Sequence, residues 1–393
     1  MNPGFHVKNI MNRQSMRRVT RLRHTFTPAI GSAGVLRWGI GVATLALAAC
    51  TTHVPTRSDA EVASTVAQIT RRIPAHVSDR QGWARDIDTA LQTQGHAANA
   101  ENICAVLAII EQESGYRADP AVANLPAIAR GEVDKRAGAL HIPRVMVEAA
   151  LKIGDGQGKT YGQRLAQVST ERELSQLYED IIARVPLGQR LFAGKNPVQT
   201  GGAMQVSVSF AQAHANGYPY PVTRSVRDEV FTRRGGVYFG TAHLLGYQTP
   251  YTRKVHRFAD YNAGWYASRN AAFQAALAQL TGVTLETDGD LLVPGAGLDK
   301  PGQTERALRS LGAQLGMNDR QIRAALERGN TLGFSGSPLH TRIFELAQAN
   351  SGKTLPRELI PGIRLDSPKI TRAMTTQWFA ERVHGRYRQC LQR

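Results

Sequence analysis

A glutamate at the end of an apolar segment is the side chain in this sequence best placed for acid–base chemistry. At about 100° per residue, Glu113 falls inside one broad apolar face of a predicted helix, which is formed by Ile103, Val106, Leu107, Ile109 and Ile110. A carboxyl group among apolar neighbours has its charged form penalised, so its pKa rises and it can hold a proton near neutral pH. Glu113 therefore has the chemistry of a general acid, although a lone Glu there could instead end its apolar stripe and extend to solvent.

Two further motifs follow Glu113 and Ser114 along the chain. Gly-Gly-Ala-Met-Gln occupies residues 201–205, and Tyr-Asn-Ala-Gly occupies residues 261–264. Each motif is common by itself. In the order Glu-Ser, Gly-x-Met-Gln, Tyr-Asn-Ala-Gly they resemble the motifs of lytic murein transglycosylases and goose-type lysozymes, over about residues 101–282.

The resemblance implies roles for the first two motifs. Glu113 would be the acid, and Ser114 would help to position it. The stretch that contains Gly202, Met204 and Gln205 would line the glycan groove. Glycine at 202 also lets a backbone approach a sugar without an intervening side chain.

The third motif would supply a tyrosine beside the acid. The turn at Asn262-Ala-Gly can place Tyr261 where its hydroxyl bonds Glu113 or the N-acetyl group of the substrate. Packing in the core with a satisfied hydroxyl is the alternative role for Tyr261.

The reaction implied by the resemblance needs one carboxyl group. Glu113 would protonate the oxygen between N-acetylmuramic acid and N-acetylglucosamine, and then, as a base, close a 1,6-anhydro ring on the muramyl C6 hydroxyl. An ordinary hydrolase instead needs two carboxyl groups around the scissile bond. Asp260 is the candidate second carboxylate for such a muramidase, although a structural role fits it better. A non-catalytic peptidoglycan-binding or scaffolding lipoprotein is a further alternative.

The first 49 residues predict export. They carry seven Lys and Arg and no acidic residue, and an apolar run leads to Leu-Ala-Ala-Cys50, which resembles a lipobox. We expect a signal peptide at 1–49 and acylation of Cys50, with an ordinary cleaved signal and a chance cysteine as the alternative. Thr51 is not Asp, which by resemblance to enteric lipoproteins favours the outer membrane, facing the periplasm. The whole sequence also resembles an uncharacterised family of proteobacterial lipoproteins.

The charge favours an anionic polymer as partner. The formal charge of +17 falls to +10 once residues 1–49 are removed, so the mature chain stays basic. Peptidoglycan carboxylates and lipid headgroups fit this charge, whereas export argues against nucleic acid. No cofactor motif is present, and His243, His256 and Asp260 lack metal-ligand spacing, so we expect neither a cofactor nor a metal.

Two cysteines remain besides Cys50. In an oxidising periplasm Cys104 and Cys390 could pair and hold the C-terminus against the body. Cys104 could equally be a buried free thiol.

The chain is predicted to be mainly α. We expect a tether and N-terminal helical segment at 50–100, a lysozyme-like domain at 101–282 with a helical insertion at about 120–196, and a smaller helical domain at 283–393. The insertion could form a wall or lid of the groove, or could occlude it. The basic stretch 382–388 is interpreted as a solvated face.

Overall fold

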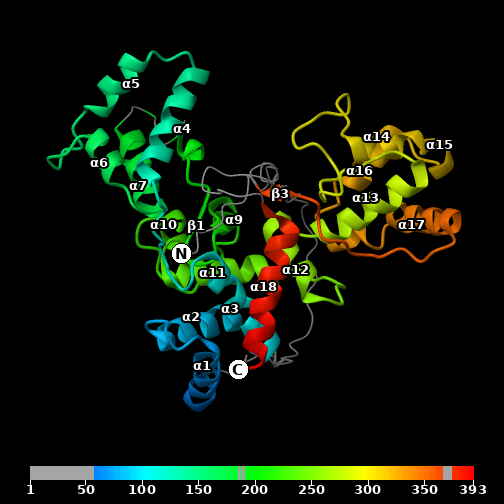
Figure 1. Ribbon diagram of the computed structural model, residues 1–393, viewed down its shortest axis with the longest axis horizontal. Helices are drawn as coiled ribbons and strands as arrows, with labels where there is room; N and C mark the ends of the chain where they lie inside the picture. The colour runs from blue at the N-terminus through cyan, green and yellow to red at the C-terminus, as the bar shows by residue number, and fades with distance from the viewer. Residues whose placement is uncertain (1–56, 185–186, 188–189, 191, 366–373) are drawn as a thin grey trace, which may run out of the picture.

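The chain folds mainly as α-helices, which confirms the predicted class. The computed structural model describes residues 57–184, 187, 190, 192–365 and 374–393, so the expected signal peptide and Cys50 lie outside the described residues. Three helical groups, each with its own apolar core, are visible in Figure 1.

The largest group, called the body below, surrounds one buried helix, α3. Its helices are α1 (Asp59–Arg72), α2 (Arg80–Thr93), α3 (Ala100–Glu113), α9 (Val208–Ala213), α10 (Val226–Val230), α11 (Arg233–Leu245), α12 (Lys254–Ala263) and α18 (Thr376–Leu391). Helices α18 and α11 pack directly on α3, and α1 and α2 join the same core. The helices of the expected N-terminal helical segment, α1 and α2, therefore pack in the body.

Helix α3 is covered on all sides. Every residue from Ile103 to Ile110 is buried, and so is Gln112, where the sequence predicted a single apolar face. The Asn99 side chain caps the first turn by accepting the Asn102 N–H at 2.8 Å. Gly115, with φ of 57°, ends the helix, and its N–H donates to the Ile110 carbonyl.

The second group contains α13 to α17. Its elements are α13 (Ala267–Thr281), α14 (Gln303–Ser310), α15 (Gly312–Leu315), α16 (Asp319–Leu326), η3 (Leu332–Phe334) and α17 (Pro338–Ser351). Buried Arg269 of α13 donates to the Thr331 carbonyl at 2.8 Å and lies over the rings of Tyr266 and Phe334. The expected boundary near residue 283 is therefore displaced: α13 packs with this group, while α18 returns to the body.

The insertion forms the third group. It contains α4 (Leu125–Ala139), α5 (Arg144–Leu151), α6 (Tyr161–Gln167), α7 (Glu171–Ala183) and η2 (Ala193–Lys195). Aliphatic residues of α4 to α7 line an apolar cavity of about 1020 Å³ inside it, and Glu171 is one of the lining residues.

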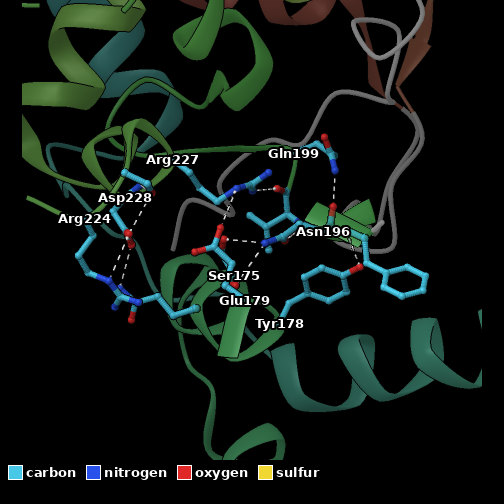
Figure 2. Close-up of polar contacts among 12 residues, drawn as sticks. Ser175, Tyr178, Glu179, Asn196, Gln199, Arg224, Arg227 and Asp228 are labelled. Atoms are coloured by element: carbon cyan, nitrogen blue, oxygen red, sulfur yellow. Dashed lines mark hydrogen bonds and ion pairs between the residues drawn. The ribbon is translucent and has the colours of Figure 1, made fainter. Parts of the chain in front are cut away.

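Helix α7 of the insertion is fastened to the body by a buried polar network (Figure 2). Arg227 of α10 pairs with Glu179 at 3.2 Å and donates to the Val198 carbonyl at 2.6 Å. Gln176 of α7 donates to Asp228 at 3.1 Å. The insertion is thereby held against the body through side chains as well as through the chain.

The described part of the chain also contains two short antiparallel pairs of strands. Strands β1 (Thr200–Gly201) and β2 (Val206–Ser207) pair Gly201 with Val206, and the turn between them is residues 202–205. Strands β3 (Arg364–Leu365) and β4 (Met374–Thr375) lead into α18.

Cys104 and Cys390 are joined by a disulfide that spans 286 positions of sequence. The bond connects α3 to the last turn of α18. It fixes the C-terminal helix on the helix that carries Glu113.

Reduction of this disulfide is expected to destabilise the body. Closing so long a loop restricts the unfolded chain, which the chain-entropy account values at roughly 5 kcal/mol. Urea unfolding with and without dithiothreitol measures the loss of free energy of unfolding. The double variant Cys104→Ser/Cys390→Ser is the control and should not respond to reductant. Equal stability of the wild type in both conditions would contradict the prediction.

Candidate functional site

Glu113 is the last residue of α3 and is buried, with 4% of its surface exposed. Burial raises the pKa of its carboxyl group well above the usual 4.5; Arg386 opposes that rise, and Glu171 adds to it. The Oε2 atom has no hydrogen-bond partner. Glu113 is therefore a buried carboxyl that favours its protonated form, as a general acid requires.

The turn at residues 202–205 is shaped by packing against the body. Gly202 has φ of 75°, and a Cβ there would collide with the Val230 carbonyl oxygen. The Met204 side chain is buried against Gly240 of α11. These two residues thus seat the turn on the body, which differs from the expectation that they line a sugar groove.

Gln205, the last residue of that turn, has a polar side chain that contacts Glu171 of the insertion. Its backbone adopts a left-handed conformation with φ of 51°, and its Nε2 donates to Glu171 at 3.2 Å. The Oε1 atom of Gln205 is buried without a hydrogen-bond partner. The insertion therefore reaches the site through this contact.

Tyr261 lies beside Glu113 and is held by the same turn. Its hydroxyl donates to the Met204 carbonyl at 2.7 Å, and His243 contacts the Tyr261 carbonyl at 3.2 Å. Burial, followed by the nearby Glu113, raises the pKa of the Tyr261 phenol. Tyr261 is thus a buried side chain whose hydroxyl is satisfied by backbone, which is the alternative role considered for it, and its proton is not directed to Glu113.

Ser114 and Asn262 each make a hydrogen bond to another part of the chain. The Ser114 hydroxyl donates to the Ile110 carbonyl at 3.0 Å and accepts the Arg117 N–H, so it caps the end of α3. The Asn262 Oδ1 accepts the Thr376 hydroxyl at 2.9 Å, which ties α12 to the start of α18. Both residues are buried supports of the site.

Two charged residues beside Glu113 escaped the sequence reasoning. Glu171, the first residue of α7, is 3% exposed and interacts with Glu113. Arg386 of α18 pairs with Glu111 at 3.4 Å and donates to Gln112 at 2.5 Å, so this part of the stretch 382–388 is not a solvated face. A signal did exist for each: a Thr-x-x-Glu capping box places Glu171 at a helix start, and an apolar stripe indicates that α18 docks.

Asp260 has a structural role. Its carboxylate accepts bonds from the hydroxyls of Tyr247 and Tyr251 and from the N–H groups of Tyr266 and Ser268. Burial raises its pKa to about 6 despite these bonds. Asp260 joins α12 to the start of α13 and is not shared with Glu113.

The described ranges contain no cluster of three or more His, Cys, Asp or Glu side chains able to hold a metal ion. Within the same ranges, no helix has both the length and the apolar character needed to span a membrane.

Residues 76–393 match the family model described as "Protein of unknown function (DUF1615)", and the chain belongs to this family. It is similar to the uncharacterized protein YaiW of Escherichia coli (strain K12), with 49% identity over 352 residues. The aligned region covers 89% of this chain and 96% of that protein. No solved structure matches the chain.

The buried Glu113 has a cost in stability that a neutral variant should remove. Because its pKa is raised in the folded state, folding binds a proton, and stability falls as pH rises above the usual 4.5. Glu113→Gln should therefore be more stable than the wild type at pH 8, by about 1.4 kcal/mol for each unit of the rise, and similar to it at pH 4.

Urea unfolding at the two pH values measures this difference. Glu101→Gln is the matched control, because Glu101 lies on the same helix, is exposed and pairs with Lys254. If the difference in free energy of unfolding between the wild type and Glu113→Gln is the same at pH 8 and at pH 4, Glu113 is not a protonated buried acid.

Proposed function

We propose that this protein is a lipid-anchored lytic transglycosylase that cleaves peptidoglycan glycan strands between N-acetylmuramic acid and N-acetylglucosamine. The observation that carries the proposal is Glu113, a buried carboxyl at the end of an apolar helix with a raised pKa. The order of the three motifs supports it, because Glu113, the 202–205 turn and Tyr261 meet in one place. The lysozyme-like fold is part of the same proposal.

The residues of the site fit the acid and base steps of this reaction. Glu113 donates its proton to the glycosidic oxygen as that bond breaks, and the substrate's N-acetyl carbonyl stabilises the oxocarbenium-like centre. The resulting Glu113 carboxylate then accepts the proton of the muramyl C6 hydroxyl as its oxygen attacks C1 and closes the 1,6-anhydro ring. Atoms balance without water, and Glu113 ends protonated, ready for another turnover.

The burial of Glu113 sets a condition on this reaction. With 4% of the residue exposed, a glycan can reach the carboxyl only if neighbouring side chains move.

The same burial favours a second candidate function. A protein that keeps this fold to bind glycan strands, or to scaffold an envelope assembly, could leave Glu113 enclosed. Such a protein would sediment with sacculi and release no product.

Mass spectrometry of the soluble products tests the proposal. Purified mature protein should release 1,6-anhydromuropeptides from sacculi. Glu113→Gln should lower the release by roughly 100- to 10,000-fold, the range that a general acid typically contributes. A muramidase would give products heavier by one water. Undiminished release by Glu113→Gln would reject Glu113 as the acid.

Attachment to the membrane would follow from acylation of Cys50, in line with the lipobox at 47–50. Several acyl chains hold a protein far more firmly than one. Cells that express the full chain should incorporate labelled palmitate into it, and Cys50→Ser should lose both the label and the outer-membrane fraction. Label retained by Cys50→Ser would refute Cys50 as the anchor. Recovery of the wild type in the inner membrane would refute the outer-membrane location.

A further inference from the structure

We propose that Glu171, delivered by the insertion, is a positioning residue of the site that carries the negative charge while Glu113 carries the proton. This inference rests on the proposed function for its catalytic meaning. The charge arrangement itself can be measured without any turnover.

Glu113 lies at the C-terminal end of one helix, and Glu171 lies at the N-terminal end of another. Glu113 is the last residue of α3, where the negative end of the helix dipole disfavours a carboxylate. Glu171 is the first residue of α7, where the positive end favours one. The two helix dipoles thus favour the charged form of Glu171 and disfavour the charged form of Glu113.

The hydrogen bonds point the same way. The Gln205 amide donates to Oε2 of Glu171 at 3.2 Å, and a bond donated to a carboxylate favours its charged form. Oε2 of Glu113 has no such donor. A proton shared between the two groups is therefore better placed on Glu113.

The position of Glu171 is fixed by the fold. Thr170, which caps α7, forms an antiparallel bridge with Ala121, and Val122 donates to the Ser169 carbonyl at 2.9 Å. Farther along α7, Glu179 is held by Arg227 (Figure 2). Glu171 is consequently a rigid part of the site, not the tip of a movable lid.

The other charged groups around Glu113 are few and come from known elements. Arg386 of α18 lowers the pKa of Glu113, and Tyr261 of α12 lies beside it as a neutral phenol. Asp119 interacts with Glu171 and accepts bonds from Thr170 and Arg172. With Glu171 neutralised, burial and Arg386 would still act on Glu113 but the repulsion from Glu171 would be gone, so the carboxyl of Glu113 would ionise more readily.

The experiment is a titration of the mature chain labelled with ¹³C at the glutamate carboxyl carbons. Glu113→Gln identifies the Glu113 signal, and its midpoint is compared between the wild type and Glu171→Gln. We expect the midpoint to move to lower pH in Glu171→Gln and to stay in place in Asp180→Asn, a control on the same helix that pairs with Arg164 outside the site. An unmoved midpoint in Glu171→Gln would overturn the proposal.

Two additions keep the outcome decisive. Glu171→Asp retains the charge and should keep the midpoint close to the wild-type value, which a role in packing alone would not predict. If Glu171→Gln fails to fold, the wild-type spectra decide: Glu171→Asp identifies the Glu171 signal, which must titrate at lower pH than the Glu113 signal, and the reverse order would overturn the proposal.

The pH profile of product release gives a second reading. Above the midpoint, a fall of one unit in the pKa of Glu113 lowers the fraction of protonated acid about tenfold, so Glu171→Gln should lose activity at high pH by such a factor and little at low pH. A chain that releases no product but shows the shifted midpoint would reject the proposed function and still support the pair of carboxyl groups.

Discussion

The structure depends on the burial of α3, an apolar helix that ends in a carboxyl group. Because residues 103–110 of α3 are all apolar, other helices must cover this stretch on all sides, and α11, α12 and α18 supply that cover directly or through each other. Glu113 is carried into the same dry environment, where its charge is penalised. A fold that is stabilised by covering this helix therefore also creates a proton-holding acid.

The cover over α3 comes from distant parts of the chain and is fastened in several ways. The disulfide to Cys390 and the bond from Arg386 to Gln112 both hold α18 on it. The insertion is held by side chains around Arg227 and by the short bridge at Thr170. The same attachments place Arg386 and Glu171 beside Glu113. The contacts that stabilise the fold therefore also set the charges around the acid.

The residues of the three motifs fall into two groups, those whose side chains meet at the site and those that pack to hold its backbone. Glu113, Gln205 and Tyr261 meet at the site, whereas Gly202, Met204, Ser114 and Asn262 hold the backbone that places them. Gly202 and Asn262 suit this role for a steric and a hydrogen-bonding reason respectively: a Cβ at 202 has no room, and the Asn262 side-chain oxygen has a partner on α18. Their presence in a motif therefore does not imply contact with a substrate.

The sequence by itself determined the helical class, the apolar surroundings of Glu113 and the glycine that ends its helix, because these follow from periodicity and local backbone preferences. Tertiary structure alone decided that α18 belongs to the body, that Cys104 reaches Cys390, and that Glu171 and Arg386 stand beside Glu113. Those contacts join residues far apart in the chain, and a single sequence carries no local signal of which distant elements will pack together. The balance of charge around the acid was accordingly fixed only when the chain folded.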